Sequence, residues 1–550
     1  MLLILLSLIF VPIVFAIGVY ITQNVKFNRM IFLLQAFQTI MFLRLLYLWR
    51  SSGTIMFNLG GWKDGIAIEL KLGYINMLFL AMVTVSFWYV VLYVWEERKN
   101  DHKFLFFTLF LQGSLYAMFC VNDLFTMYIL LELNTIISSI LIIYKKDGES
   151  IRAGFYYLIY NSLAMSIYFL GVIIMYIKFG TLNISMITAN AYLYESQTIF
   201  KFAIGLFIAA FAMKSAIVPL FSWLPIAHSS APSSISALLS GLIVKTGIYG
   251  LIMTLSIFNN KDLYNLLFVL GIVTSLVGAL YGILQLDIKK ILAYSTISQI
   301  GLIIIGVSAY DQAANLGALL HIFNHFLSKS LLFLCAGAII SASSERNIKH
   351  IHNVFRKSKI ISLGFIVGML TITGMPLFNG YIGKSMIKAG NYMIDARIIF
   401  DIINMGTVIL FVKLSTILFR KKPEKLDEID HLSDVLINDL EEKPEEEVFI
   451  VDGFKKASII YMTILTIVSY FGERMIFESQ FNMSYMFKYS NLIESMLIYT
   501  IYIAIGVLIY KYVLLRFVKE ERKYSGGFQE ASAMFVIFIG VILGFVKYFV

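Results

Sequence analysis

Charged residues are scarce in this chain: Asp, Glu, Lys and Arg make up 14% of its 550 residues, against about 25% in soluble domains. Apolar residues make up 59%, and the mean hydropathy is +0.81. These values exclude a soluble enzyme, a disordered chain and a coiled coil. The apolar runs are far longer than the strands of a membrane barrel, so we expect the chain to cross a membrane as helices.

Cysteine is almost absent. Cys120 and Cys335 both lie within apolar runs, and two thiolates cannot hold an iron–sulfur cluster, which needs four. The segment Gly383-Lys384-Ser385 resembles the end of a phosphate-binding loop, but position 378, where the first glycine should stand, is Phe378. We therefore expect no cofactor, no bound metal, and neither a redox nor a hydrolytic site. Membership of an oxidoreductase complex stays open.

Long apolar runs predict an all-α, multi-pass membrane protein with about 14 to 16 transmembrane helices of ~20 residues. Nineteen Lys and Arg residues fall in the loops after odd-numbered runs, and seven fall in the loops after even-numbered runs. Basic loops face the cytoplasm, so we expect the chain to lie in the cell membrane with its N-terminus outside. These loops also account for the net charge of +10 without a nucleic-acid partner.

The runs divide the chain into five parts. We expect N-terminal helices (1–103), a first five-helix repeat (104–256), a second, inverted five-helix repeat (257–420), an acidic loop (421–455) and C-terminal helices (456–550). Eleven of the 34 acidic residues fall between Glu424 and Glu447, where leucines and isoleucines recur at helical spacing. This pattern indicates a solvated cytoplasmic loop with one amphipathic helix. A docking surface for a sister protein of the same complex is the alternative.

Four predicted spans each place one ionisable residue near mid-membrane: Glu132, Lys214, Lys245 and Lys329. Each such residue costs at least ~2.5–3.5 kcal/mol there, so it is usually retained for a function. His321, His325 and Lys329 recur every fourth residue, within about 80° of one helix face, and His titrates near neutral pH. The series therefore favours a proton path along the midplane. Unrelated structural ion pairs are the alternative, and zinc is disfavoured because no Cys or carboxylate joins the His pair.

Two predicted helices are interrupted by proline. Pro219 follows Lys214, Pro376 precedes Lys384, and each proline is followed by Leu-Phe. The two sites are five predicted spans apart, an odd number, so the second copy runs through the membrane in the opposite direction. Paired broken helices in an inverted repeat mark the ion site of transporters, and proline frees a backbone carbonyl there.

Five ordered segments share their spacing with a known family: Asn122-Asp-Leu-Phe…Leu131-Glu132-Leu, Lys214-Ser-Ala…Pro219…Trp223-Leu-Pro225…Lys245-Thr-Gly, Asp287-Ile-Lys-Lys…Gln299, His321-Ile-Phe-Asn-His325…Lys329, and Gly374-Met-Pro…Gly380-Tyr-Ile-Gly-Lys384. Together they resemble the antiporter-like membrane subunits of respiratory complex I, group 4 membrane-bound hydrogenases and Mrp-type cation/proton antiporters. Gly60-Gly-Trp62 and Ala227-His228 resemble the Mrp and hydrogenase branches more than complex I. Ile226 departs from the family, which often has Asp after Trp-Leu-Pro.

The resemblance implies a proton channel in a multi-subunit complex with sister membrane subunits in the lipid bilayer. Glu132 would pair with Lys214, Lys245 and the His321–Lys329 series would relay protons, and Lys384 would release them. Whether sodium is also moved stays open, as does the driving reaction: hydrogenase, NADH or ferredoxin oxidation, or none. A self-sufficient secondary cation/proton transporter and a non-conducting membrane anchor are the alternatives.

Overall fold

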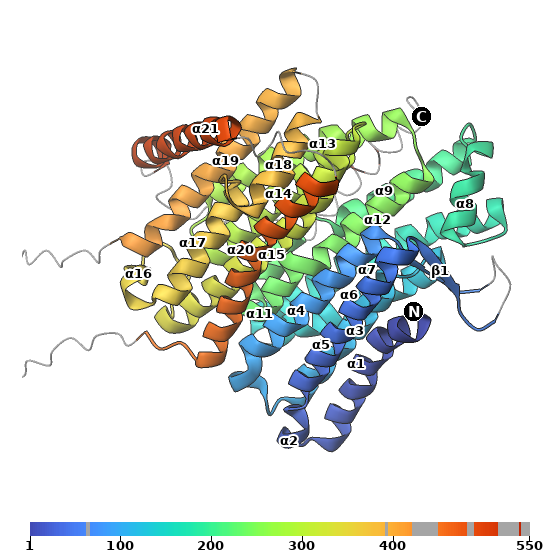
Figure 1. The fold of residues 1–550 in the computed structure, drawn as a ribbon, viewed down its shortest axis with the longest axis horizontal. Helices are drawn as coiled ribbons and strands as arrows, with labels where there is room; N and C mark the ends of the chain where they lie inside the picture. Colours follow the sequence, from blue (N-terminus) through green and yellow to red (C-terminus); the bar gives the residue numbers. More distant parts are fainter. Residues whose placement is uncertain are drawn as a thin grey trace, which may run out of the picture.

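The computed structural model describes residues 1–61, 67–390, 394–420, 449–480 and 489–514, with the single positions 538 and 540. Within these residues, 12 helices are long and apolar enough to cross a membrane, and they form one bundle (Figure 1). The prediction of an all-helical, multi-pass membrane protein is confirmed. The acidic segment from Glu424 to Glu447, Trp62 and nearly all of the last predicted span lie outside the described residues.

The N-terminal part contributes long helices at one side of the bundle and a short hairpin. Its elements are α1 (Leu2–Thr22), α2 (Val25–Asn28), α3 (Ile31–Ser52), β1 (Ile55–Asn58), β2 (Glu69–Leu72) and α4 (Tyr74–Arg98). The two strands are antiparallel, with Ile55 opposite Leu72. The hairpin was not predicted, because each strand has only four residues.

The middle of the chain contains two successive groups of membrane helices. The first group is α5 (His102–Met118), α6 (Leu124–Ile143), α7 (Gly148–Phe179), α8 (Ile184–Asn190), η1 (Ala191–Leu193), α9 (Thr198–Lys214), α10 (Trp223–Ser230), α11 (Ser233–Leu238), η2 (Leu239–Ile243) and α12 (Val244–Ile257). The second group is α13 (Lys261–Leu284), α14 (Ile288–Val307), α15 (Gln312–Ser343), α16 (Val354–Lys357), α17 (Lys359–Thr373), α18 (Asn379–Ala389) and α19 (Ile394–Phe419).

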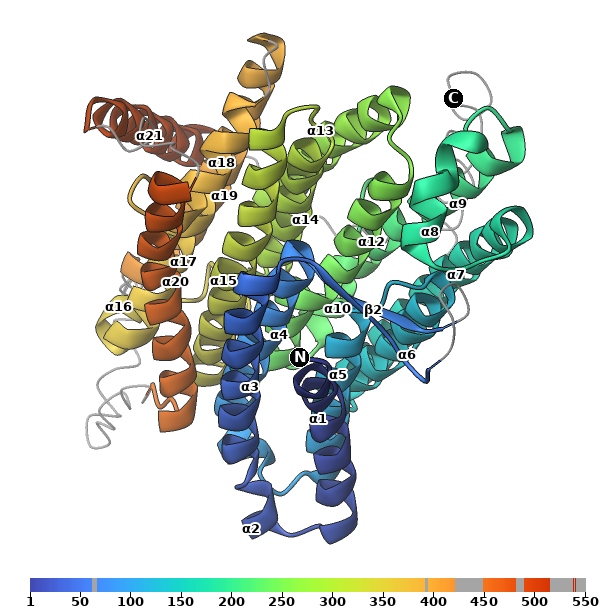
Figure 2. The ribbon, with the colours of Figure 1, turned by 45° about the vertical axis from the view of Figure 1, so that its right-hand side comes forward.

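The C-terminal part adds α20 (Gly453–Gln480), α21 (Tyr489–Ile509) and η4 (Tyr510–Leu514). Helix α20 lies along the bundle and packs on α4, α15, α17 and α18. Helix α21 contacts α19 and runs at a steep angle to its neighbours in both views (Figures 1 and 2).

Several local features recur between the two groups of helices. Asp123 and Asp287 each cap the start of a helix by accepting backbone N–H groups. Each also pairs with an asparagine through an isolated bridge, Asp123 with Asn183 and Asp287 with Asn347. The asparagine follows the aspartate by the same number of residues in both bridges. The longest helices between the bridged residues, α7 and α15, each have 32 residues.

The centre of the bundle consists of helices whose whole circumference is covered by other helices. In the 18-residue apolar stretch of the Ser233–Ile257 span 94% of the residues are buried, and in that of Ile288–Val307 89% are buried, against 11% for that of Asn491–Leu514. A helix that is enclosed in this way places its polar side chains in the protein interior, away from lipid. The polar residues of α12, α14 and α15 are therefore the ones that can form a continuous internal path.

Candidate functional site

The first broken helix comprises α9, residues 215–222 and α10. Pro219 lies in the non-helical segment, and Ala216 adopts the left-handed conformation with φ 56°, which costs a non-glycine residue about 1–2 kcal/mol. Side chains hold the segment in place: Trp223 Nε1 donates to the Met213 carbonyl at 2.8 Å, and the Val218 N–H donates to Thr274 Oγ1 at 3.1 Å. The break is thus an ordered structure that ends α9 at Lys214.

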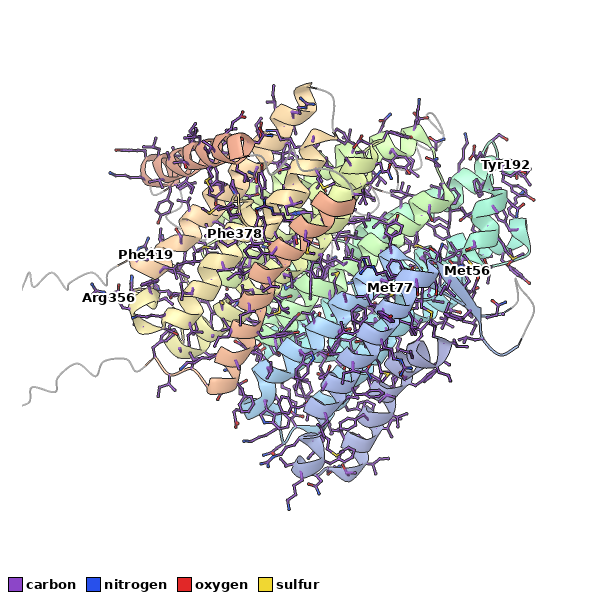
Figure 3. The ribbon with its side chains drawn as sticks, in the orientation of Figure 1. Met56, Met77, Tyr192, Arg356, Phe378 and Phe419 are labelled. Atoms are coloured by element: carbon purple, nitrogen blue, oxygen red, sulfur yellow. The ribbon has the colours of Figure 1, made fainter. Side chains whose placement is uncertain are left out.

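The second broken helix comprises α17, residues 374–378 and α18, and Phe378, labelled in Figure 3, is the last residue before α18. Pro376 lies in this segment, and Leu377 is left-handed with φ 73°. The Lys384 ammonium of α18 reaches back to the end of α17, donating to the Ile372 carbonyl at 2.7 Å and to Asn404 Oδ1 at 2.9 Å. A cation at a helix C-terminus interacts favourably with the helix dipole. The C-terminal end of α17 and Asn404 therefore bind the ammonium group of Lys384 at the second break.

Glu132 and Lys214 lie on neighbouring helices but do not form the direct ion pair that was expected. Glu132 Oε1 accepts a hydrogen bond from Ser162 of α7 at 2.5 Å, and its Oε2 has no partner among the described residues. The Lys214 ammonium donates instead to Thr135 Oγ1 at 2.7 Å. Thr135 is one helical turn from Glu132 on α6, so the lysine stands one turn away from the carboxylate. The two charges still interact electrostatically.

Lys245 follows η2, a π-helical turn in an otherwise α-helical span. Its ammonium is fully buried and donates to the Ser240 carbonyl within that turn. The Ser240 hydroxyl shares a hydrogen bond of 2.8 Å with Thr296 of α14. π-turns inside α-helices are frequent at functional sites, and this one places a backbone carbonyl beside the lysine and a hydroxyl toward α14.

The break after Lys214 lies directly against the helix of Lys245. A Cβ added to Gly247 would lie 2.4 Å from Ser215 Oγ and 3.0 Å from the Lys214 carbonyl carbon. Ser215 Oγ is buried and has no hydrogen-bond partner in the described part of the chain. Only glycine permits this approach, which brings the backbones that carry Lys214 and Lys245 into contact.

Helix α14 supplies polar groups to the basic residues of α15. The Lys329 ammonium donates to Ser295 Oγ and to the Leu292 carbonyl at 3.1 Å. Three residues on from Thr296, the Gln299 Oε1 atom lies 3.0 Å from His321 Nε2. The hydroxyl and amide groups of α14 thus connect the neighbourhood of Lys245 to that of Lys329 and His321.

His321 and His325 follow each other on α15, with ring centroids 6.2 Å apart. Both His325 nitrogens and His321 Nδ1 are buried without a partner among the residues that the structure describes, so these atoms can bind water or exchange a proton. Helix α18 packs closely on this turn: a Cβ on Gly383 would lie 3.0 Å from the His321 backbone nitrogen. Because Lys384 follows Gly383, the histidines and the second broken helix are adjacent.

A cavity of about 120 Å³ adjoins Lys384 on the other side. Residues of α18, α19 and α21 line it, including Lys384, Lys388, Asp401, Asn404, Ser495 and Tyr499. Lys388 and Asp401 form an ion pair at 2.6 Å within it, and both are partly exposed. The cavity is large enough for several waters, so Lys384 stands between a buried interior and a polar opening.

A second polar region lies at the opposite end of the first broken helix. The Lys289 ammonium donates to the Ala231 carbonyl at 2.9 Å, and Arg346 donates to the Ser229 carbonyl at 2.8 Å. Arg346 also forms an ion pair with Asp287 at 2.7 Å. These cations bind the carbonyls that end α10, which is the electrostatically favoured place for them.

Two kinds of site residue were not expected from the sequence. The hydroxyl and amide partners of the basic groups, such as Thr135, Ser162 and Asn404, are common side chains whose spacing carries no distinct signal. His228 of α10 is fully buried, stacks on Phe333 with centroids 4.8 Å apart and has two nitrogens without partners among the described residues. It lies within a motif that resembles the family, but the motif alone assigns it no role.

The chain is similar in sequence to known membrane proteins. Residues 121–409 match the transmembrane family described as NADH:quinone oxidoreductase/Mrp antiporter. A Staphylococcus aureus (strain Newman) protein named as antiporter subunit mnhD2 is 31% identical over 354 residues, covering 62% of this chain and 70% of that protein.

Two solved structures share the fold. A chain of the Mrp complex from Dietzia sp. DQ12-45-1b matches with a TM-score of 0.76 at 20% identity, covering 86% of this chain and 95% of that chain. A chain of the membrane-bound sulfane sulfur reductase, an archaeal respiratory membrane complex, matches with a TM-score of 0.75 at 22% identity, covering 91% and 99%.

Proposed function

The chain belongs to the NADH:quinone oxidoreductase/Mrp antiporter family of transmembrane proteins, and from this membership we propose that it is a proton-translocating membrane subunit of a multi-subunit complex. The observation that carries the proposal is the row of buried basic groups in the bundle: Lys214, Lys245, His321, His325, Lys329 and Lys384. Each basic group costs free energy inside a membrane protein. A non-conducting anchor would have no reason to retain six of them in adjacent helices.

The proton path we propose runs along these groups and their polar partners. From Lys214 it crosses at Gly247 to Lys245, passes through Ser240 and Thr296 to α14, and continues to Lys329 and the two histidines. Lys384 and the adjoining cavity form the exit. Hydroxyls can pass a proton along because each is both donor and acceptor, and water completes the steps between them.

Separation of Glu132 and Lys214 is the switch we propose. A carboxylate close to an ammonium favours the charged forms of both, and desolvation opposes this. In the observed arrangement the Lys214 ammonium donates to the neutral Thr135 hydroxyl. In the proposed cycle this is the state in which Lys214 is ready to give its proton to Lys245. Closing the distance to Glu132 would hold the proton on Lys214. A sister subunit that shifts α6 or α9 could therefore drive transport.

The recurring Asp–Asn bridges and the equal lengths of α7 and α15 support the inverted five-helix repeat as part of this proposal. The two broken helices then occupy matched positions, one in each repeat. In this arrangement Lys214 ends the helix before its break, whereas Lys384 follows its break, so the two lysines have different roles.

The proposal predicts that proton flux requires the complete complex. In vesicles that contain the complex with its sister subunits, we expect a pH gradient that is driven by the coupled reaction or by an opposing Na⁺ gradient. Vesicles with this chain alone should show neither. Flux from the chain alone would favour the self-sufficient transporter, and absence of flux from a complex whose other activities are intact would favour the anchor.

The loop charges predict that the N-terminus faces outward in the cell membrane. Glu149 lies in the first turn of α7, and Ser196 lies between η1 and α9, beyond the other end of α7. Both are exposed and the native cysteines are buried, so single cysteines at these positions can be labelled against a low background. A membrane-impermeant thiol reagent added to intact cells should label Ser196→Cys and spare Glu149→Cys. The reverse pattern would invert the orientation.

A further inference from the structure

Glu473 is a buried carboxylate that the path described above does not use. It lies on α20, outside the two predicted repeats, and is 7% exposed. Its Oε2 accepts a hydrogen bond from Asn324 Nδ2 at 3.1 Å, and its Oε1 is buried with no partner in the described part of the chain. Among the residues that the structure describes, no Lys, Arg or His side chain forms an ion pair with it. Glu473 is thus a carboxyl group with one neutral donor.

The single donor, Asn324, ties Glu473 to the second broken helix. Asn324 Nδ2 also donates to the Asn379 carbonyl at 2.9 Å, and Asn379 is the first residue of α18. The Asn379 side chain in turn donates to Ser469 of α20 at 2.7 Å. These hydrogen bonds, together with the α20 backbone between Ser469 and Glu473, form a ring that joins α15, α18 and α20 at the point where α18 begins.

The ring is adjacent to the two histidines. Asn324 directly precedes His325 and follows His321 by three residues on α15, so Glu473 faces the same turn of that helix. The amide of Asn324 cannot turn its oxygen toward Glu473 without losing its bond to the Asn379 carbonyl, because a carbonyl accepts and does not donate. The donor of Glu473 is therefore fixed on the same turn of α15 as His321 and His325.

Charge balance then limits the state of Glu473. A lone carboxylate in a dry interior is strongly disfavoured unless it is paired or neutralised, and an amide N–H does not neutralise it. Glu473 must therefore hold a proton in this arrangement. It becomes ionised only when a positive charge arrives nearby, and protonation of His321 or His325 supplies such a charge.

We propose that Glu473 is a proton-exchanging group of the second half of the path: it passes its proton to Lys384 when His321 or His325 becomes charged, and it takes the next proton from that histidine once Lys384 has discharged into the adjoining cavity. The proposal rests on the proposed function. It assigns to α20 the acidic member that the second broken helix lacks, in the way that α6 supplies Glu132 to the first. No atom other than the proton changes its bonding, so the step needs no oxidant or reductant.

The test uses Glu473→Gln in the complete complex. Glutamine keeps the shape of the side chain and an oxygen that accepts from Asn324, so a purely structural role would survive the change. We expect proton transport to fall at least about tenfold while the amount of assembled complex stays normal, and Glu473→Asp to retain part of the transport. Glu494→Gln, the same change at an exposed position of α21, should leave transport unchanged.

Infrared spectroscopy gives a second readout that does not depend on transport. The wild-type complex should show the C=O band of a protonated, buried carboxyl group, and Glu473→Gln should lack that band while Glu494→Gln keeps it. Normal transport in Glu473→Gln, or an unchanged carboxyl band, would overturn the proposal. If the wild-type complex moves no protons, the proposed function fails, and the infrared band still decides the state of Glu473.

Discussion

Proton transport should stop in Lys384→Arg, although arginine retains the positive charge and the hydrogen-bond donors. Arginine cannot release a proton in a protein, so it can occupy the site but cannot act as a carrier. Lys384→Met should also abolish transport, and it leaves the Ile372 carbonyl and Asn404 Oδ1 without their shared donor, at a cost of about 1–3 kcal/mol in stability. We expect both variants to lose transport at least about tenfold, equivalent to ~1.4 kcal/mol in the barrier.

Lys413 provides a matched control for Lys384→Arg. It is also a buried lysine, on α19, and its ammonium donates to the Ile283 carbonyl at 2.7 Å and to the Gln285 carbonyl near the end of α13. Since these bonds need only a fixed charge, Lys413→Arg should assemble and transport protons. Proton flux measured in vesicles, normalised to assembled complex, separates the two lysines. Wild-type flux in Lys384→Arg would remove Lys384 from the path.

The second large effect is expected for Glu132→Gln. This change removes the negative charge nearest to Lys214 while the Ser162 hydroxyl keeps an acceptor, so Lys214 loses the charge that controls its proton. Transport should fall at least about tenfold, and Glu132→Asp should keep part of it because the charge survives. A buried Lys214 without a nearby counter-charge also lowers stability, by up to ~3–5 kcal/mol if the site is dry.

The double variant Glu132→Gln with Lys214→Met tests whether the two residues are coupled without direct contact. It removes both charges, so the complex should be more stable than Glu132→Gln alone, yet it should not transport protons. Thermal unfolding of the purified complex measures the first effect, and proton flux the second. Residues in one interaction network typically show a coupling free energy of about 0.5–3 kcal/mol in a double-mutant cycle, and we expect a value in this range for Glu132 and Lys214. A double variant no more stable than the weaker single variant would show that Glu132 does not act on Lys214.

Hydropathy and the cost of burying charge were sufficient to identify most of the spans, the buried lysines and the two interrupted helices. Those features depend on how deep a residue lies in the membrane, and that depth follows from the position of the residue within an apolar run of the sequence. The partner of each charge depends on how neighbouring helices are rotated, which the sequence does not record. Lys214 therefore contacts Thr135, not Glu132, although both lie on one face of α6.

Glu473 shows the same limit more clearly. It lies two residues before the end of an apolar run, 456–475, in the predicted C-terminal part of the chain, and an ionisable side chain at the end of such a run usually reaches the membrane surface. Helix α20 continues to Gln480, so this glutamate lies inside the helix and not at its end. Only the packing of α20 against α15 and α18 brings it to Asn324, and no spacing within the chain predicts that contact.

The 32-residue lengths of α7 and α15 have a mechanical consequence. Such a helix is about 48 Å long at 1.5 Å per residue, whereas the hydrocarbon layer is ~30 Å thick and helix tilts rarely exceed about 40°. Even at that tilt, roughly one and a half turns of each helix extend beyond the hydrocarbon layer. Because His321, His325 and Lys329 lie on this one continuous helix, a displacement of α15 along its axis, applied at the end that projects into water, would move the three groups together.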